Sequence, residues 1–158
     1  MKYKHRLGNF PMVFLPLLAL LAGSAIAVQA SMNAHLGVLL RNSLFGTAVA
    51  FCVSSIFTLI AIVLTTKHYP SLATIKAVPY YMWFTGAAFS SLGVSLFYFL
   101  IPRLGIGPTM SFALTAQIIV AVVASHFGWF DLPQRSINGT RLSGIVALLS
   151  GIYLINWK

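Results

Sequence analysis

Long apolar runs alternate with short polar segments along the whole chain. A membrane-spanning helix needs about 20 mostly apolar residues, and five runs reach that length. We expect spans at about residues 10–30, 43–66, 80–101, 109–127 and 139–156, and the first helix can continue to residue 40. The runs leave no room for a soluble domain. The pattern therefore predicts an all-α integral membrane protein, a five-transmembrane-helix bundle that forms a single domain over residues 1–158.

Polar and helix-breaking residues separate these runs. Lys67 and Pro70 end the second run, and Arg41 with Asn42 must serve as the turn before it. The segment from Pro102 to Pro108 has a proline at each end and two glycines between them. Prolines and glycines are typical of turns and loops. We expect this segment to form either a gate or a rigid corner.

Composition fits the same class of protein. The chain has 158 residues, of which 59% are hydrophobic and 7% charged, and its mean hydropathy is +0.91. Soluble domains carry about 25% charged residues, so an ordinary soluble enzyme and a disordered regulator are both excluded. The net charge of +9 comes from basic residues scattered singly between apolar runs. Because these residues form no basic patch, we expect the lipid bilayer, and not nucleic acid, as the surrounding partner.

The basic residues are distributed unequally between the two sides of the predicted bundle. With a cytoplasmic N-terminus, the cytoplasmic side carries seven of them: Lys2, Lys4, Arg6, Lys67, Lys76, Arg135 and Arg141. The other side carries three, Arg41, Arg103 and Lys158. Cytoplasmic loops are enriched in Lys and Arg. The distribution therefore favours a cytoplasmic N-terminus.

The first run also has the outline of a secretory signal peptide. Its basic start and apolar stretch lead to small residues at Ala25 and Ala27, which resemble a cleavage site. Cleavage there would leave four spans. We interpret the run as a true span because it is long for a signal peptide and continues into the polar positions Gln29 and Asn33.

Three amide side chains inside the apolar runs are the first candidates for solute binding. Gln29 and Asn33 are spaced i, i+4 and so share one face of a helix, and Gln117 lies near the middle of the fourth run. Polar groups are costly inside a membrane, and amides both donate and accept hydrogen bonds. They suit a neutral or zwitterionic ligand. The alternative is that they only join neighbouring helices by hydrogen bonds.

Hydroxyl and small side chains give weaker signals. Ser91 and Ser95 share one face of the third span, and Ser111 and Thr115 share one face of the fourth. These four could line a cavity, or each could bond the backbone of its own helix. Small residues also recur at four-residue spacing, as in the first-span stripe Ala19, Gly23, Ala27 and Ser31. Such stripes favour close helix packing.

Missing residue types narrow the chemistry. The sequence has no glutamate, and its one aspartate, Asp131, lies between the fourth and fifth runs. A carboxylate proton relay inside the membrane and paired-carboxylate catalysis are therefore excluded. Cys52 is the single cysteine, and no HExxH spacing occurs. We expect no metal, no cofactor and no enzymatic activity.

An ordered set of short segments resembles the small bacterial YdcZ-type proteins of the drug/metabolite transporter superfamily. The resemblance runs from about residue 23 to 153 and rests on Gln29-Ala30 through Asn33, Leu36-Gly37, Ile101-Pro102-Arg103-Leu104-Gly105, Gln117, His126-Phe127-Gly128, Arg141-Leu142-Ser143-Gly144 and Gly151. It implies a multi-pass protein of the bacterial cytoplasmic (inner) membrane with five transmembrane helices. Larger members of the superfamily look like two such units in inverted orientation within one chain.

The resemblance thus implies one half of an inverted-repeat transporter that moves a small solute by alternating access. A single unit needs an oppositely oriented mate, either a second copy in an inverted homodimer or a paired homologue, because such transporters bind solute between their halves. The related small multidrug exporters use a membrane glutamate that this chain lacks, which favours a neutral, zwitterionic or anionic solute. Two alternatives are a passive channel built as an antiparallel dimer and a non-transporting membrane subunit of another complex.

Overall fold

In the computed structural model, which describes residues 14–131 and 133–157, the chain is built from helices. Five of the helices within these residues are long and apolar enough to cross a membrane, so the predicted fold class is confirmed. They are α1 (Phe14–Leu39), α2 (Ser43–Thr65), α4 (Met82–Leu104), α5 (Ile106–Phe127) and α6 (Gly139–Asn156). Two short elements, α3 (Leu72–Ala77) and the 3₁₀ turn η1 (Trp129–Asp131), lie in connections.

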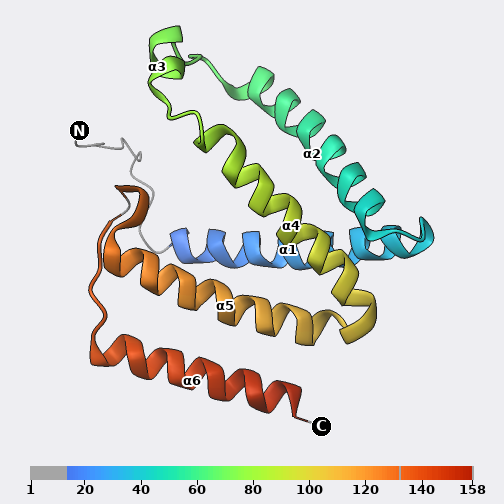
Figure 1. The fold of residues 1–158 in the computed structure, drawn as a ribbon, viewed down its shortest axis with the longest axis vertical. Helices are drawn as coiled ribbons and strands as arrows, with labels where there is room; N and C mark the ends of the chain where they lie inside the picture. The colour runs from blue at the N-terminus through green and yellow to red at the C-terminus, as the bar shows by residue number, and fades with distance from the viewer. Residues whose placement is uncertain (1–13, 132, 158) are drawn as a thin grey trace. The chain divides into compact units, whose positions relative to one another are not determined.

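Some of the sequence predictions concern residues outside the described part of the chain. These are the start of the first expected span at residues 10–13, the N-terminal basic residues Lys2, Lys4 and Arg6, and Lys158. The chain divides into two compact units, Met1–Tyr98 and Phe99–Lys158. Helix α4 (Figure 1) crosses the division.

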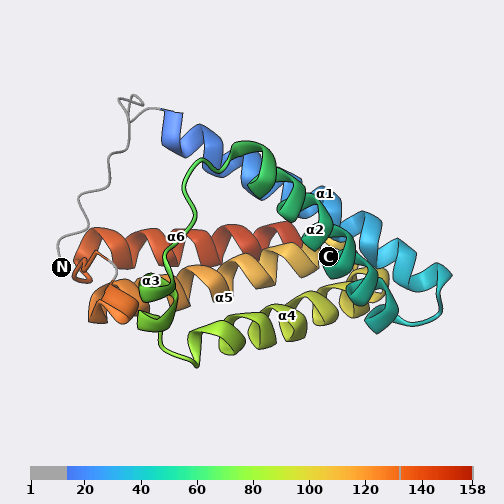
Figure 2. The ribbon, with the colours of Figure 1, turned by 90° about the horizontal axis from the view of Figure 1, so that it is seen from above.

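The first unit is organised around a hairpin of α1 and α2. Arg41 takes a left-handed conformation with φ 53° in the turn between the helices. Asn42 then caps α2, because its side-chain Oδ1 accepts a hydrogen bond of 2.8 Å from the backbone N–H of Leu44. Both views of the ribbon show the two helices meeting at this turn (Figures 1 and 2).

Small residues allow the two helices of the hairpin to touch. Ala30, Ala34 and Gly37 are the buried positions of α1. A Cβ atom on Gly46 of α2 would lie 3.0 Å from the carbonyl oxygen of Asn33 and 3.1 Å from the Cα of Gly37. The contact therefore follows Ala30, Ala34 and Gly37 and not the expected stripe through Gly23, where an added Cβ would meet nothing within 4 Å. The stripe through Gly23 takes no part in the α1–α2 contact, and packing of that stripe against another chain stays a prediction.

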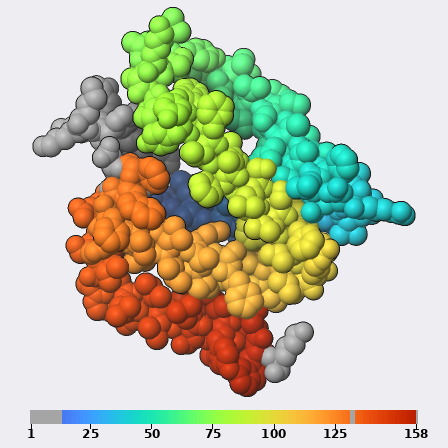
Figure 3. Space-filling view, viewed as in Figure 1, coloured from blue at the N-terminus to red at the C-terminus, as the bar shows by residue number. Residues whose placement is uncertain are grey.

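Helix α4 joins this hairpin through side-chain hydrogen bonds. The hydroxyl of Ser95 donates to Thr47 Oγ1 of α2 at 3.2 Å, and Thr47 is itself buried. Near the hairpin turn α4 runs close to α1 and α2, and toward α3 it separates from them (Figure 2). The surface is hollowed between α2 and α4 (Figure 3).

In the second unit, α5 and α6 pack side by side and antiparallel (Figures 1 and 2). The segment expected to form a loop between Pro102 and Pro108 is helical on both sides of Gly105, which has φ +85°. Proline is tolerated in the first turn of a helix because the N–H groups there have no intrahelical acceptor, which suits Pro108. This junction is a one-residue corner and not a loop.

The connection between α5 and α6 folds back onto the end of α5. The side chain of Gln134 donates to the carbonyl oxygen of His126 at 2.8 Å, and the N–H of Arg135 donates to the carbonyl of Ser125 at 2.8 Å. Arg141 of α6 donates to the carbonyl oxygen of Arg135 at 2.9 Å. The bonds to Ser125 and His126 satisfy carbonyl groups that the end of α5 leaves without partners.

Large apolar side chains cover the outside of both units. Leu20 on α1 is 69% exposed, Leu64 on α2 78% and Phe89 on α4 75%. Water would make such a surface unstable, since each exposed large apolar side chain forgoes about 1.5–3 kcal/mol of burial. Lipid tails remove that penalty, so these exposed apolar side chains suit an apolar surrounding such as the interior of a membrane.

Candidate functional site

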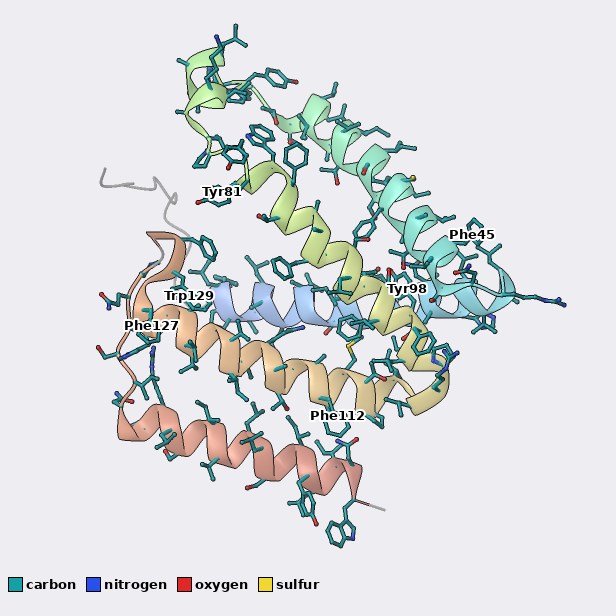
Figure 4. The ribbon with its side chains drawn as sticks, in the orientation of Figure 1. Phe45, Tyr81, Tyr98, Phe112, Phe127 and Trp129 are labelled. Carbon is teal, nitrogen blue, oxygen red and sulfur yellow. The ribbon has the colours of Figure 1, made fainter. Side chains whose placement is uncertain are left out.

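Three polar side chains meet where α4 crosses the hairpin. Asn33 Nδ2 donates to Gln29 Oε1 and to the hydroxyl oxygen of Tyr98, each at 3.0 Å. The Tyr98 hydroxyl donates to Gln29 Oε1 at 3.2 Å. Figure 4 shows Tyr98 on α4 at this crossing. We call Gln29, Asn33 and Tyr98 the amide–tyrosine cluster.

The local structure explains why these three groups meet. The i, i+4 spacing places Gln29 and Asn33 one helical turn apart on α1, as predicted from the sequence. Tyr98 is only 2% exposed, and a buried tyrosine normally finds a partner for its hydroxyl. The two amides of α1 supply that partner. The same contact therefore ties α4 to α1.

The cluster keeps hydrogen-bonding capacity to spare. Its bonds involve Asn33 Nδ2 and Gln29 Oε1, which leaves Gln29 Nε2 and Asn33 Oδ1 without a partner among the described residues. Flipping both amides by 180° would exchange the roles of the two residues, since the oxygen and nitrogen of an amide are placed by their hydrogen bonds. Either arrangement leaves one free amide NH₂ group and one free amide carbonyl. Among the described residues, the cluster thus has one unpartnered donor and one unpartnered acceptor, on two residues one helical turn apart.

A groove of about 610 Å³ opens beside the cluster, between α1, α2 and α4. Small-molecule sites commonly measure about 300–1,000 Å³. The groove is mostly apolar and contains no Lys, Arg, His, Asp or Glu. Its lining residues are Ala25, Ile26, Gln29, Asn33, Val49, Ala50, Phe51, Val53, Ser54, Phe57, Val94 and Tyr98. An apolar groove with a few converging polar groups is the usual form of a small-molecule site.

Two further residues predicted for the site also lie on α4. Ser95 is half-buried and donates a hydrogen bond to Thr47. It lies on the same side of α4 as Tyr98, about one helical turn away. Ser91 is exposed and does not line the groove. Of the residues predicted for the site, Gln29 and Asn33 therefore come together in the first unit, and Ser95 lies near them.

The other predicted residues belong to the second unit. Gln117 is exposed on α5. Ser111 donates to the carbonyl of Gly107 and Thr115 to the carbonyl of Ser111, both at 2.9 Å within α5. These are bonds to their own helix, the alternative that applies widely to hydroxyl residues in membrane helices.

Thr115 also lines a groove of about 440 Å³ between α5 and α6. Leu149 and Ile152 form its α6 side, and Phe112 points from α5 toward α6 (Figure 4). At its end, Asn156 donates to the carbonyl of Ile152 at 2.8 Å, but its Oδ1 is buried and has no partner within the described residues. Asn156 was not singled out from the sequence, because it stands at the end of the last expected span.

Metal-binding residue types do not gather in this structure. Within residues 14–131 and 133–157, no group of three or more His, Cys, Asp or Glu lies close enough to hold a metal ion. The polar side chains that line the first-unit groove are amide, hydroxyl and phenol groups. Such groups bind by hydrogen bonds and carry no charge at neutral pH.

Together, the five long apolar helices define a multi-pass helical membrane protein, and the groove is its candidate site for a small molecule. Comparison with protein families gives the particular family. The family described as "Putative inner membrane exporter, YdcZ" matches residues 14–154, and the chain belongs to it. The resemblance seen in the sequence is thereby confirmed. Membership supports a membrane transporter of the inner membrane. Comparison with curated proteins and with solved structures gives no match.

Proposed function

We propose that this protein is half of a transporter that moves a small solute across the inner membrane by alternating access. The amide–tyrosine cluster beside an apolar groove is the observation that carries the proposal. A polar group inside a membrane helix is costly and usually functional. The family description supports export as the direction.

In this proposal the solute contacts Gln29 and Asn33, and Tyr98 anchors α4 to them. The bonds of Tyr98 are the main polar link between α1 and α4 in the first unit. A solute that bonds the unpartnered groups of the same amides would draw these side chains away from Tyr98 and so loosen α4. Binding would then favour movement of α4, as alternating access requires.

The second unit has its own candidate for solute binding. Gln117 on α5 is exposed and has an amide, so it is available to a solute or to a partner chain. We propose that Gln117 also binds solute in the transporter. Replacing it with leucine removes the amide at similar volume, and Gln117→Leu should abolish transport while the protein still folds.

The proposed assembly contains two units in opposite orientations. The groove is lined by helices of one unit and is not enclosed, whereas transporters with inverted repeats enclose the solute between two halves. A second copy of this chain or a paired homologue would supply the other wall. Reporters fused to the C-terminus and active on opposite sides of the membrane distinguish these partners: signal from both sides indicates an inverted homodimer, and signal from one side a homologue.

Efflux from proteoliposomes tests the proposal with a mixture of candidate solutes. Liposomes that contain the protein are loaded with a protein-free extract of bacterial metabolites, and mass spectrometry follows what leaves. The proposal predicts that one chemical class leaves faster than from protein-free liposomes, with a saturable rate that falls in Asn33→Leu but not in Met32→Leu. Met32 is a suitable control because it neighbours Asn33 and is 68% exposed.

The same experiment separates the proposal from its alternatives. A passive channel would release many unrelated small compounds at rates that do not saturate. A subunit of another complex would release nothing beyond the protein-free control. Either result would overturn the transporter proposal.

A further inference from the structure

The lining of the first-unit groove restricts which solutes it accepts. Its polar groups are the amide–tyrosine cluster and the hydroxyl of Ser54, and its walls include Phe51 and Phe57. No lining residue carries a charge. A charged head placed there would lose its hydration without gaining a counter-charge, which is strongly unfavourable in an apolar site.

The free groups of the cluster have a definite pattern. Within residues 14–131 and 133–157, one amide NH₂ and one amide carbonyl have no partner, on residues joined by a bond of 3.0 Å between Asn33 Nδ2 and Gln29 Oε1. A carboxamide head offers the complementary pair, since its carbonyl accepts and its NH₂ donates. An ammonium head only donates, and a carboxylate only accepts. Each charged head would leave one group of the cluster unsatisfied.

We infer that the groove binds an uncharged solute that has a carboxamide-type head, with a donor and an acceptor side by side, on an apolar or aromatic body. The body lies against Phe51 and Phe57, and the head bonds Gln29 and Asn33. This inference rests on the proposed function and narrows its solute from neutral, zwitterionic or anionic to uncharged.

Three matched probes test the head group. Benzamide, benzoate and benzylamine share a phenyl ring and have, at neutral pH, an uncharged amide, an anionic and a cationic head. The full-length protein in detergent is titrated with each probe, and the midpoint of thermal unfolding gives an apparent Kd. We expect a saturable increase with benzamide and affinities for the two charged probes that are lower by about tenfold, which corresponds to the loss of one or two hydrogen bonds.

Two variants of Gln29 test whether the preference for benzamide depends on the amide–tyrosine cluster. Gln29→Glu keeps an oxygen that accepts from Asn33 and Tyr98 but removes the NH₂ donor, so the packing of α4 is preserved. We expect benzamide to bind about 3- to 10-fold more weakly to it, and benzylamine to become the tightest probe. Gln29→Leu should lose the preference for benzamide, and the exposed control Met32→Leu should keep it.

Several results would overturn the inference. These are equal or tighter binding of benzoate or benzylamine to the wild type, no saturable shift with any probe, and unchanged benzamide affinity in Gln29→Glu. The efflux experiment has a separate outcome. If saturable efflux depends on Asn33 but the benzamide preference is absent, the solute class is wrong and the transporter proposal stands. If benzamide binds as expected but nothing leaves the proteoliposomes, the transport function fails and the binding site stands.

Discussion

Removal of one hydroxyl group, in Tyr98→Phe, tests whether the cluster holds α4 to α1. The substitution keeps the ring in its buried position, where the side chain is 2% exposed. It removes the bond of 3.0 Å from Asn33 and the bond of 3.2 Å to Gln29. The bond between the two amides is retained. The loss is therefore confined to the polar contact between the two helices.

The expected change in the free energy of unfolding follows from these two bonds. Hydrogen bonds between membrane helices contribute about 0.6 kcal/mol on average and at most about 1.7 kcal/mol. Two lost bonds lower the free energy of unfolding by about 1.2 kcal/mol, and by no more than about 3.4 kcal/mol. A loss of about 1.2 kcal/mol is close to a tenfold change in the unfolding equilibrium.

Unfolding in mixed micelles with an increasing fraction of sodium dodecyl sulfate, followed by circular dichroism, measures this change. Tyr80→Phe is the matched control, because Tyr80 is 82% exposed and the same atom is removed. Tyr98→Phe should be less stable than the wild type, and Tyr80→Phe should equal it. If both variants are equally stable, the cluster does not join α4 to α1 and the reasoning is wrong.

Two more predictions test the packing, one in each unit. Gly46→Leu should lower the free energy of unfolding by at least about 1–3 kcal/mol, because even a Cβ would lie 3.0 Å from a backbone atom of α1. Gly23→Leu should be tolerated, because nothing lies within 4 Å of a Cβ added there. Thermal unfolding in detergent compares the two variants, and equal stability would contradict this packing. Asn156→Leu should raise the free energy of unfolding by about 1 kcal/mol, because it removes a buried oxygen without a partner. A destabilised Asn156→Leu would show that this oxygen receives a hydrogen bond from a lipid or a partner chain.

The five-helix fold could be predicted from the sequence because membrane-spanning helices are recognised by the length and low polarity of their sequence segments. Apolar runs of about 20 residues have few other uses. The details of helix contact could not be predicted in the same way. Small residues at four-residue spacing are frequent on several faces of α1, and the face at Ala30, Ala34 and Gly37 is selected by its fit to Gly46 of α2.

The candidate site was predictable where its signal is local. Gln29 and Asn33 are polar in an apolar run and share a helical face, so the sequence alone singles them out. Tyr98 lies 65 residues from Asn33 along the chain. Near the expected end of its span at residue 101, a tyrosine is typical of the aromatic belt at the membrane surface. Tyr98 is buried because α4 crosses α1 at this point, and no local sequence pattern predicts that crossing.

Cysteine labelling on α2 tests most directly whether the groove is part of a solute path. Cys52, the single cysteine, is first replaced by serine, and a cysteine is then placed at Ser54, which lines the groove, or at its neighbour Ser55, which does not. If the groove is a path for solute, a membrane-impermeant maleimide should modify Ser54→Cys much faster than Ser55→Cys, and benzamide should slow only the faster reaction. Equal rates at the two positions, or no reaction at Ser54→Cys from either side of the membrane, would contradict the account.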